Sequence, residues 1–136
     1  MLIKNITWEA AIPIRHSVLW PNKPLSFCMV EGDDKAKHYG VFLDEKLVAV
    51  ASVYQRGTEA RLRKFATLSE FQGRGFGSAL ITHIIQELKQ TDTTRFWCDA
   101  RTSAVAFYQR LGLNTYGATF YKSGLPYIKM SLPLQL

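Results

Sequence analysis

The chain has 136 residues, the length of one domain, and its composition of 47% hydrophobic and 21% charged residues excludes a mainly disordered protein. No apolar run approaches the length of a membrane span and no basic, then apolar leader opens the chain, so we expect a cytoplasmic protein without a membrane partner. Seventeen lysines and arginines against eleven aspartates and glutamates give a net charge of +6, which favours an anionic partner. No repeat or linker divides the chain, so we expect residues 1–136 to form a single domain.

The first half of the chain predicts one helix followed by strands. Thr7 can cap a helix that runs towards Leu19, and Pro13 should kink this helix or restart it. After a proline-containing loop, short runs rich in valine and aromatic residues predict strands, and two of them should form a hairpin across Glu45 and Lys46. The expected strands are residues 26–30, 39–44, 47–54 and 60–67.

The second half predicts two helices with clear apolar stripes. Residues 75–89 carry leucines and isoleucines at helical spacing, and residues 103–111 repeat the pattern before Gly112 ends the helix. The remaining expected strands are residues 95–100, 118–121 and 127–132. This order of elements favours an α/β (α+β) domain with a mixed sheet and helices on both faces.

The cysteines and histidines indicate neither a disulfide framework nor a metal site. Cys28 and Cys98 are the only cysteines, and neither lies in a metal-ligand spacing. The three histidines, His16, His38 and His83, lack such a spacing as well. We therefore expect no metal cofactor, and a reducing compartment such as the cytosol.

A glycine-rich turn at residues 72–78, of sequence QGRGFGS, joins an expected strand to an expected helix. Glycines at alternate positions let the backbone approach a ligand closely, and the start of the helix offers unpaired N–H groups to an anion. The turn lacks the lysine of a Walker loop, and its spacing excludes a Rossmann fingerprint. The pattern favours a pyrophosphate beside Arg74, and the alternative is a turn that merely packs tightly.

Two motifs, at residues 72–77 and 104–113, lie in an order and at a distance that are typical of one family. The first, QGRGFG, resembles the Gln/Arg-x-x-Gly-x-Gly/Ala signature of the GCN5-related N-acetyltransferases (GNAT), and the second, AVAFYQRLGL, resembles their Ala-x-x-Phe-Tyr-x-x-Leu-Gly-Phe helix and turn. Residues 62–68 look like the splayed central strand of this family. The resemblance implies the acyl-CoA N-acyltransferase fold, with a mostly antiparallel central sheet. It also implies an enzyme that transfers the acetyl group of acetyl-CoA to a primary amine of a small molecule or protein, by direct attack of the amine.

The same resemblance implies roles for individual residues. The backbone of Phe65, Ala66 and Thr67 would pair with the pantetheine arm of acetyl-CoA as an added strand does. Tyr108 would donate a proton to the leaving thiolate, and the alternative for this residue is a core aromatic. The diphosphate would be held by Gln72, Gly73, Arg74, Gly75, Phe76, Gly77 and Ser78.

Two positions depart from the family pattern. Histone-type members carry a general-base glutamate eleven positions before the motif glutamine, where this chain has Arg61, which cannot accept a proton. Glu59, on the same face, is either a substitute base or a solvated charge. Many members place an asparagine that contacts the cofactor arm where this chain has Arg101, whose guanidinium could bind a carbonyl or phosphate instead. Arg61 motivates the alternative function of a non-catalytic module that binds or senses acyl-CoA.

For the amine acceptor, the sequence offers candidates at strand ends and in loops. His38 follows an acidic stretch and precedes a strand, so it is a candidate base or substrate contact, with a structural role as the alternative. Tyr54, Trp97 and Asp99 lie where an amine pocket could form. Asp99 could pair with a cationic amine or with Arg101.

The basic residues gather around the glycine turn, which favours a polyanionic cofactor over a nucleic acid. Five of them lie between residues 56 and 74, whereas residues 31–45 are mainly acidic. The chain has neither a basic recognition helix nor the aromatic and basic motif of an RNA-binding sheet, so we expect no nucleic-acid partner. The terminal hairpin offers a strand edge through which two chains could form a homodimer.

Overall fold

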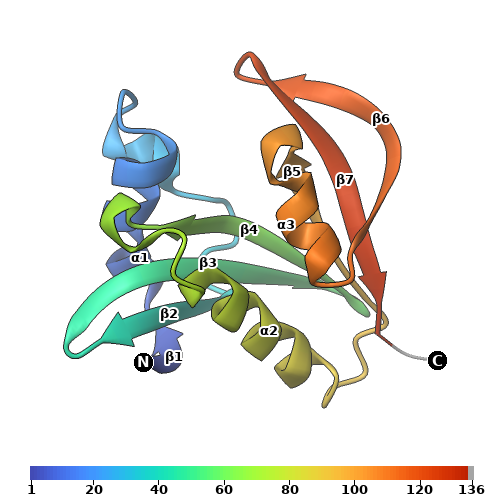
Figure 1. The fold of residues 1–136 in the computed structure, drawn as a ribbon, viewed down its shortest axis with the longest axis horizontal. Helices are drawn as coiled ribbons and strands as arrows, with labels where there is room; N and C mark the ends of the chain where they lie inside the picture. The colour runs from blue at the N-terminus through green and yellow to red at the C-terminus, as the bar shows by residue number, and fades with distance from the viewer. Residues whose placement is uncertain (135–136) are drawn as a thin grey trace.

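A computed structural model describes residues 1–134 and confirms the expected fold class (Figure 1). One seven-stranded sheet has the order β1-β2-β3-β4-β5-β7-β6, and its neighbouring strands are antiparallel except β4 and β5, which are parallel. The strands are β1 (Leu2–Ile6), β2 (Lys37–Leu43), β3 (Lys46–Arg56), β4 (Glu59–Thr67), β5 (Arg95–Arg101), β6 (Asn114–Lys122) and β7 (Leu125–Pro133). The α-helices are α1 (Trp8–Ile14), α2 (Phe76–Leu88) and α3 (Val105–Arg110).

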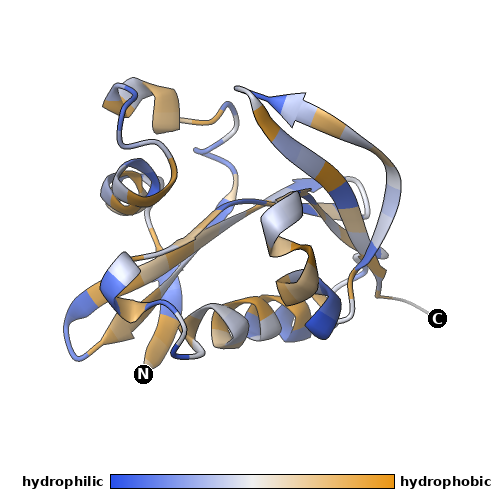
Figure 2. Ribbon diagram, turned by 45° about the horizontal axis from the view of Figure 1, so that its top comes forward, coloured by the Kyte–Doolittle hydropathy of each residue, from blue (hydrophilic) through white to orange (hydrophobic). Residues whose placement is uncertain are grey.

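Helices cover both faces of the sheet, as the sequence predicts (Figure 2). Helix α2 buries its apolar stripe, which includes Leu80 and Leu88, in the main core beneath the sheet. Helix α1 lies on the opposite face, where Ile14 packs in a second cluster with Val50 and Ala66. None of the helices within residues 1–134 is long and apolar enough to cross a membrane.

Strands β4 and β5 pair over only part of their length and then diverge. Their register runs from Glu59 opposite Arg95 to Leu62 opposite Cys98, and no pair follows along the described strands. Figure 1 shows the consequence, since β5, β6 and β7 rise away from the plane of β1 to β4. Beyond Leu62, the edge of β4 that faces β5 keeps N–H and C=O groups without a strand partner, and such groups favour an added strand-like ligand.

A β-bulge in β4 reverses the alternation of its side chains at this divergence. Opposite β3, the register shifts by one residue between Arg63 and Ala66, and Lys64 has a left-handed backbone with φ 56°. Leu62 belongs to the main core with α2, whereas Ala66, four residues later, packs in the cluster with α1. The bulge thereby turns Phe65 towards α3.

The N-terminal segment contains the largest differences from the sequence-based prediction, whereas later elements differ in their bounds, as β6 does at Asn114–Lys122. Helix α1 ends at Ile14 with Pro13 in its last turn, and a π-helix continues over Arg15–Leu19. The expected strand at residues 26–30 is wrong, since Leu25–Cys28 forms a 3-10 helix after Pro24. Strand β1 was not expected, because its mostly exposed side chains give no alternating pattern.

A buried polar cluster holds this irregular segment against the sheet. Arg15 is fully buried and donates two hydrogen bonds of 3.0 Å to the carboxylate of Asp33, and others to the Cys28 carbonyl and the Ser52 hydroxyl. His38 joins the Ser52 hydroxyl and the Asp33 carbonyl, each at 2.7 Å. The loop after the 3-10 helix is therefore tied to strands β2 and β3.

Replacement of Asp33 by alanine should lower the free energy of unfolding by about 3–5 kcal/mol, because the charge of Arg15 would stay buried without a partner. Burial favours a raised pKa for Asp33, but hydrogen bonds from Arg15, Tyr54 and the Val30 N–H, with the charge of Arg15, hold its pKa below the usual range. This stabilisation is present above the ordinary carboxyl pKa near ~3.9 and is lost as the pH falls. Urea unfolding between pH 7 and 3 measures both effects. The exposed neighbour gives the control Asp34→Ala, and equal losses in the two variants would contradict the prediction.

Candidate functional site

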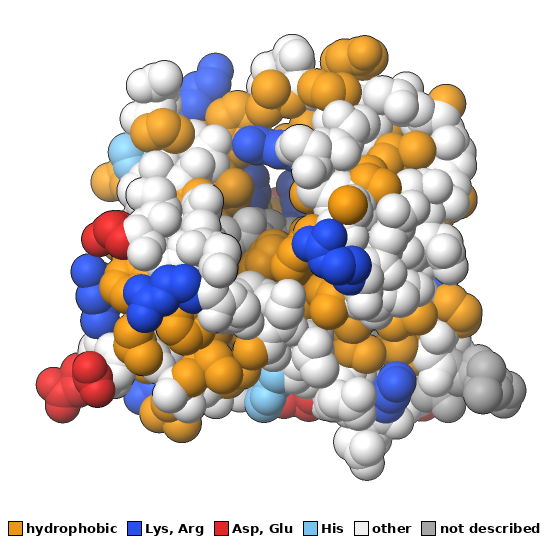
Figure 3. Space-filling view, in the orientation of Figure 1, with side chains coloured by type: hydrophobic (Ala, Val, Ile, Leu, Met, Phe, Trp, Pro, Cys, Tyr) orange, Lys and Arg blue, Asp and Glu red, His pale blue; other side chains and the backbone are white. Residues whose placement is uncertain are grey.

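A pocket of about 990 Å³ fills the opening between β4 and β5. Its walls come from the end of β4, the glycine turn with the start of α2, the end of β5, and α3. Its other side is closed by residues 18–20, Phe27, residues 29–31 and the turn between β6 and β7. Figure 3 shows the hollow, with lysine and arginine side chains across it and at its back.

The glycines of the turn keep one end of the pocket clear. Gly73 and Gly75 have φ of 74° and 85°, and a Cβ placed on either would meet no atom within 4 Å. At Gly77, a Cβ would lie 2.8 Å from the ring of Phe65. The first two glycines therefore serve a backbone conformation beside open space, and the third permits close packing of α2 against β4.

The start of α2 suits an anion. Gly75 is the N-cap of this 13-residue helix and supplies no capping side chain, so the first N–H groups remain available to a ligand. The Gln72 side chain donates a 2.9 Å hydrogen bond to the Thr67 carbonyl, which ties the turn to the end of β4. Arg74 belongs to the turn, and its guanidinium lies over the ring of Phe76.

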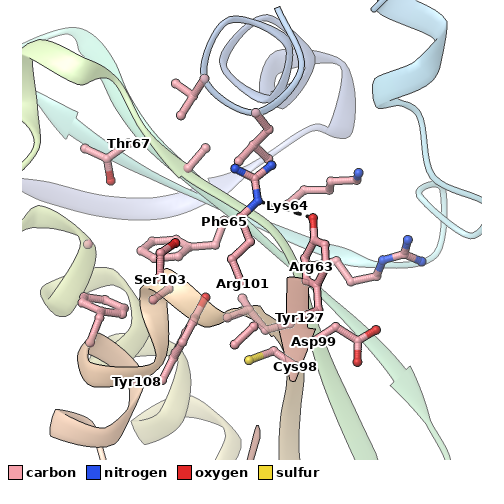
Figure 4. A pocket seen from close by; sticks show the side chains of 18 of the residues that line it. Arg63, Lys64, Phe65, Thr67, Cys98, Asp99, Arg101, Ser103, Tyr108 and Tyr127 are labelled. Carbon is pink, nitrogen blue, oxygen red and sulfur yellow. Dashed lines mark hydrogen bonds between the residues drawn. The ribbon is translucent and has the colours of Figure 1, made fainter. Parts of the chain in front are cut away.

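Tyr108 comes from α3 and points into the pocket from the wall opposite β4 (Figure 4). Its side chain is buried among aromatic neighbours, with ring centroids 5.1 Å from Phe107 and 6.4 Å from Phe65. Burial, with a smaller contribution from Cys98, raises the pKa of Tyr108 above its usual value. The hydroxyl is therefore protonated at working pH and can donate a hydrogen bond into the pocket.

The carboxylate of Asp99 is held by three cations. Arg61 and Lys129 each donate to it at 2.8 Å, and Lys122 lies at 3.3 Å. Burial favours a raised pKa for Asp99, but the Lys129 hydrogen bond and the charges of Lys122 and Arg61 keep its pKa low. The guanidinium of Arg61 also stacks 4.7 Å from the ring centroid of Trp97. This part of the pocket wall is therefore an ion cluster with an excess of positive charge.

Residues 22–134 match the family model described as the acetyltransferase (GNAT) domain. The chain belongs to the GNAT family. It is 33% identical over 132 residues to the uncharacterized N-acetyltransferase YitI of Bacillus subtilis, covering 90% of this chain and 89% of that protein. It is 32% identical over 101 residues to the ribosomal protein bS18-alanine N-acetyltransferase of Salmonella typhimurium, covering 68% of each. Membership in the GNAT family supports acyltransferase activity.

Solved structures of GNAT proteins share the fold. The ribosomal-protein-S18-alanine N-acetyltransferase of Escherichia coli superposes with a TM-score of 0.84 at 23% identity, covering 99% of this chain and 94% of that one. The N-acyl amino acid synthase FeeM, from uncultured soil microbes, superposes with a TM-score of 0.80 at 16% identity, covering 98% and 90%. Proteins named for different acceptors thus share this fold, so the acceptor of this GNAT chain must be argued from its own pocket.

The structure brings most of the candidate cofactor residues of this GNAT chain together in one pocket. Arg101 lines the pocket as well. Its side chain donates a 3.4 Å hydrogen bond to the Tyr127 hydroxyl, and its guanidinium lies 5.4 Å from the ring centroid of Trp20. Arg74 lies beside the pocket and not among its lining residues. The expected residues that line it are Phe65, Ala66, Thr67, Gln72, Gly73, Gly75, Phe76, Gly77, Ser78 and Tyr108.

The candidate acceptor residues separate into two groups. Asp99 lines the pocket, and it pairs with Arg61 and two lysines instead of with Arg101. Trp97 lies outside the lining, beneath the cation of Arg61. His38 and Tyr54 belong to the buried cluster around Arg15, where burial and the hydrogen bond to Asp33 raise the pKa of Tyr54 to about 12.

Sequence analysis did not single out Arg63, Lys64 and Lys122 as site residues, although all three line the pocket. Arg63 and Lys64 were visible as basic residues of a predicted strand. The sequence did not predict the bulge at Lys64, which directs these side chains to the pocket. The bulge depends on pairing with β3 and leaves no local pattern in the sequence. Lys122 reaches the pocket through the long hairpin of β6 and β7.

Neither cysteine should react with a chromogenic disulfide reagent in the folded protein within minutes. Cys28 and Cys98 are both buried, and burial, with the charge of Asp99, raises the pKa of Cys98 to about 12. Two thiols per chain should react after denaturation in urea. The comparison also serves as the control for any assay that counts released coenzyme thiol, and rapid labelling of the native protein would contradict the prediction.

Proposed function

We propose that this GNAT protein transfers the acetyl group of acetyl-CoA to a primary amine by direct attack of the amine on the thioester. One observation carries the proposal. A single pocket joins an anion-binding turn at one end, an unpaired strand edge along its length, and the protonated hydroxyl of Tyr108 on its wall. These features match in order the diphosphate, the pantetheine arm and the thioester of the coenzyme.

The binding role belongs to the turn and to β4. Residues 72–78 would hold the diphosphate through N–H groups at the start of α2, with Arg74 adding a positive charge. Ala66 and Thr67 pair with β3 on one edge of β4, and residues 65–67 leave the other edge to amide groups of the pantetheine arm. Bound acetyl-CoA supplies an acetyl group activated by its thiol leaving group.

Tyr108 would stabilise the departing sulfur. As the amine nitrogen forms a bond to the carbonyl carbon and the carbon–sulfur bond breaks, negative charge develops on the sulfur. A hydrogen bond from a buried hydroxyl stabilises that charge strongly, because little water competes for it. The proton of the amine leaves to water, since Arg61 stands where histone-type members have a base and is itself bound to Asp99.

Calorimetric titration with acetyl-CoA tests the binding step, and thiol release with a panel of amines tests transfer. We expect one acetyl-CoA per chain at micromolar concentration and thiol release that depends on the amine. Desulfo-coenzyme A serves as the binding control without a reactive thioester. Absence of binding at high micromolar acetyl-CoA would reject the proposal.

The second candidate is a non-catalytic module that binds acyl-CoA. The observation in its favour is Arg61, which replaces the family glutamate and is engaged with Asp99 and Trp97. Tight binding of acetyl-CoA without thiol release for any amine would favour this module. Turnover with even one amine would exclude it.

A further inference from the structure

Three cations line the part of the pocket wall away from α3, which we call the acceptor side, and none of them has an ion-pair partner among the described residues. Arg63, Lys64 and Arg101, which we call the cationic wall, all line the pocket. Figure 4 shows Arg63 and Lys64 on the side away from Tyr108 and Ser103, with the Arg101 guanidinium between the two sides. Within residues 1–134, no carboxylate forms an ion pair with any of the three.

The acidic residues of the pocket do not neutralise the cationic wall. Asp99 is already shared among Arg61, Lys122 and Lys129. Glu31, the other carboxylate in the lining, is exposed at the rim. The acceptor side therefore carries an uncompensated positive charge.

Burial makes this uncompensated charge costly. Lys64 is half-buried, and burial, together with the charges of Arg63 and Arg15, lowers its pKa to about 8. Burial and the charge of Arg61 lower the pKa of Arg63 as well. A protein that keeps partly buried cations without partners can gain binding free energy from an anionic ligand.

The bulge in β4 places Arg63 and Lys64 on the side of the pocket away from α3. Lys64 occupies the extra residue of the bulge, with its left-handed φ of 56°. Because the bulge sends Phe65 towards α3, Arg63 and Lys64 are left to the other side of the pocket. The bulge therefore lies directly after the point where β4 leaves β5, and it directs Arg63 and Lys64 away from α3.

The phosphates of acetyl-CoA do not explain this charge. The diphosphate site at Gly75 follows β4 in the chain, whereas Arg63 and Lys64 precede residues 65–67, along which the pantetheine arm would lie. The coenzyme arm thus separates the anion-binding turn from the cationic wall. We therefore expect an anion that meets the wall to enter with the acceptor.

We propose that the acceptor is a small primary amine that carries a carboxylate, and that Arg63, Lys64 and Arg101 bind this carboxylate while the amine faces the thioester. This inference rests on the proposed acetyl transfer and specifies its substrate class. The rings of Trp20 and Tyr127, which flank the Arg101 guanidinium, limit the space around the acceptor. Polyamines and aminoglycosides are disfavoured, because their charges would repel the wall.

The first test compares each amino acid with its own amide. Thiol release is measured with glycine, β-alanine and γ-aminobutyrate, with their primary amides, and with putrescine, and rates are expressed per unprotonated amine. We expect kcat/KM for the best carboxylate to exceed that of its amide about tenfold, as hydrogen bonds to a charged group allow. Equal or faster turnover of the amides or of putrescine would reject the proposal that the acceptor carries a carboxylate. It would leave the proposed acetyl transfer intact.

Lys64→Met should reduce this carboxylate-to-amide ratio about threefold or more, because it removes one charge and keeps most of the side-chain volume. Lys89→Met is the matched control, since Lys89 is exposed at the end of α2 and remote from the pocket. The control should keep the ratio of the parent protein. An unchanged ratio in Lys64→Met would remove Lys64 from the assignment.

A binding measurement keeps the inference testable without turnover. The protein saturated with coenzyme A is titrated with N-acetyl-β-alanine and with its amide. We expect the carboxylate to bind about tenfold more tightly, and less so at high salt, because the contact is partly exposed. Equal affinities would overturn the inference whatever the amine panel shows. Tighter binding of the carboxylate without turnover of any amine would reject only the proposed acetyl transfer.

Discussion

Replacement of Tyr108 by phenylalanine is expected to lower kcat about hundredfold while acetyl-CoA binds within about twofold of the parent affinity. The hydroxyl points into the pocket, and no described residue accepts a hydrogen bond from it. The ring packs against Phe65 and Phe107, and phenylalanine preserves those contacts. The variant therefore removes a donor to the developing thiolate and little else.

The measurement is thiol release at saturating acetyl-CoA, with calorimetric titration for affinity. Tyr121→Phe provides the matched control, because Tyr121 is 70% exposed on β6 and its hydroxyl forms no hydrogen bond within residues 1–134. The control should leave both quantities unchanged. A Tyr108→Phe variant with the parent rate would show that the hydroxyl plays no part in transfer, and Tyr108 would then be a core aromatic.

Elements with local signals were predicted well from the sequence. Helix α2 has a continuous apolar stripe, and the structure places it at Phe76–Leu88, within one residue of the expected bounds. The glycine turn was also visible, because positive φ at Gly73 and Gly75 reflects a conformational need that glycine meets locally. These two features, with the motif around Tyr108, were enough to predict the fold and to select residues that the structure brings together in one pocket.

The features that the sequence did not predict depend on contacts between distant residues. The cluster of Arg15 joins residues that are 13 to 39 positions away along the chain, and it holds His38 outside the pocket lining. The bulge at Lys64 exists only in the register between β3 and β4. Because neither leaves a periodic pattern, the acceptor side of the pocket could not be read from spacing.

These contacts show which of the cations behind the net charge of +6 remain unpaired in the pocket. Asp33 pairs with Arg15, and Asp99 pairs with Arg61 and two lysines, so neither carboxylate neutralises Arg63, Lys64 or Arg101. In the proposed function, this positive charge would bind two anions, the diphosphate at the glycine turn and the carboxylate of the acceptor. The coenzyme arm would lie between the two sites, so both could be filled at once.

Replacement of Gly75 by aspartate is expected to weaken acetyl-CoA binding at least about hundredfold. A Cβ at Gly75 meets no protein atom within 4 Å, so the new carboxylate would extend into the space that the diphosphate needs at the start of α2. Two such charges ~5 Å apart at an effective dielectric of ~20 repel by roughly 3 kcal/mol, which corresponds to about a hundredfold in affinity. The positive φ of 85° adds backbone strain of about 1 kcal/mol.

Two comparisons separate the charge from the strain. Gly75→Ala introduces the strain alone and should weaken binding about tenfold or less. Gly57→Asp places the same carboxylate at a glycine with φ 60° and open surroundings in the β3–β4 turn, outside the pocket lining, and should leave binding unchanged. Calorimetric titration of the three variants, with thermal unfolding to verify their folding, gives the result. If Gly75→Asp binds acetyl-CoA as tightly as Gly75→Ala, the diphosphate does not lie at the start of α2, and the coenzyme must enter the pocket in another orientation.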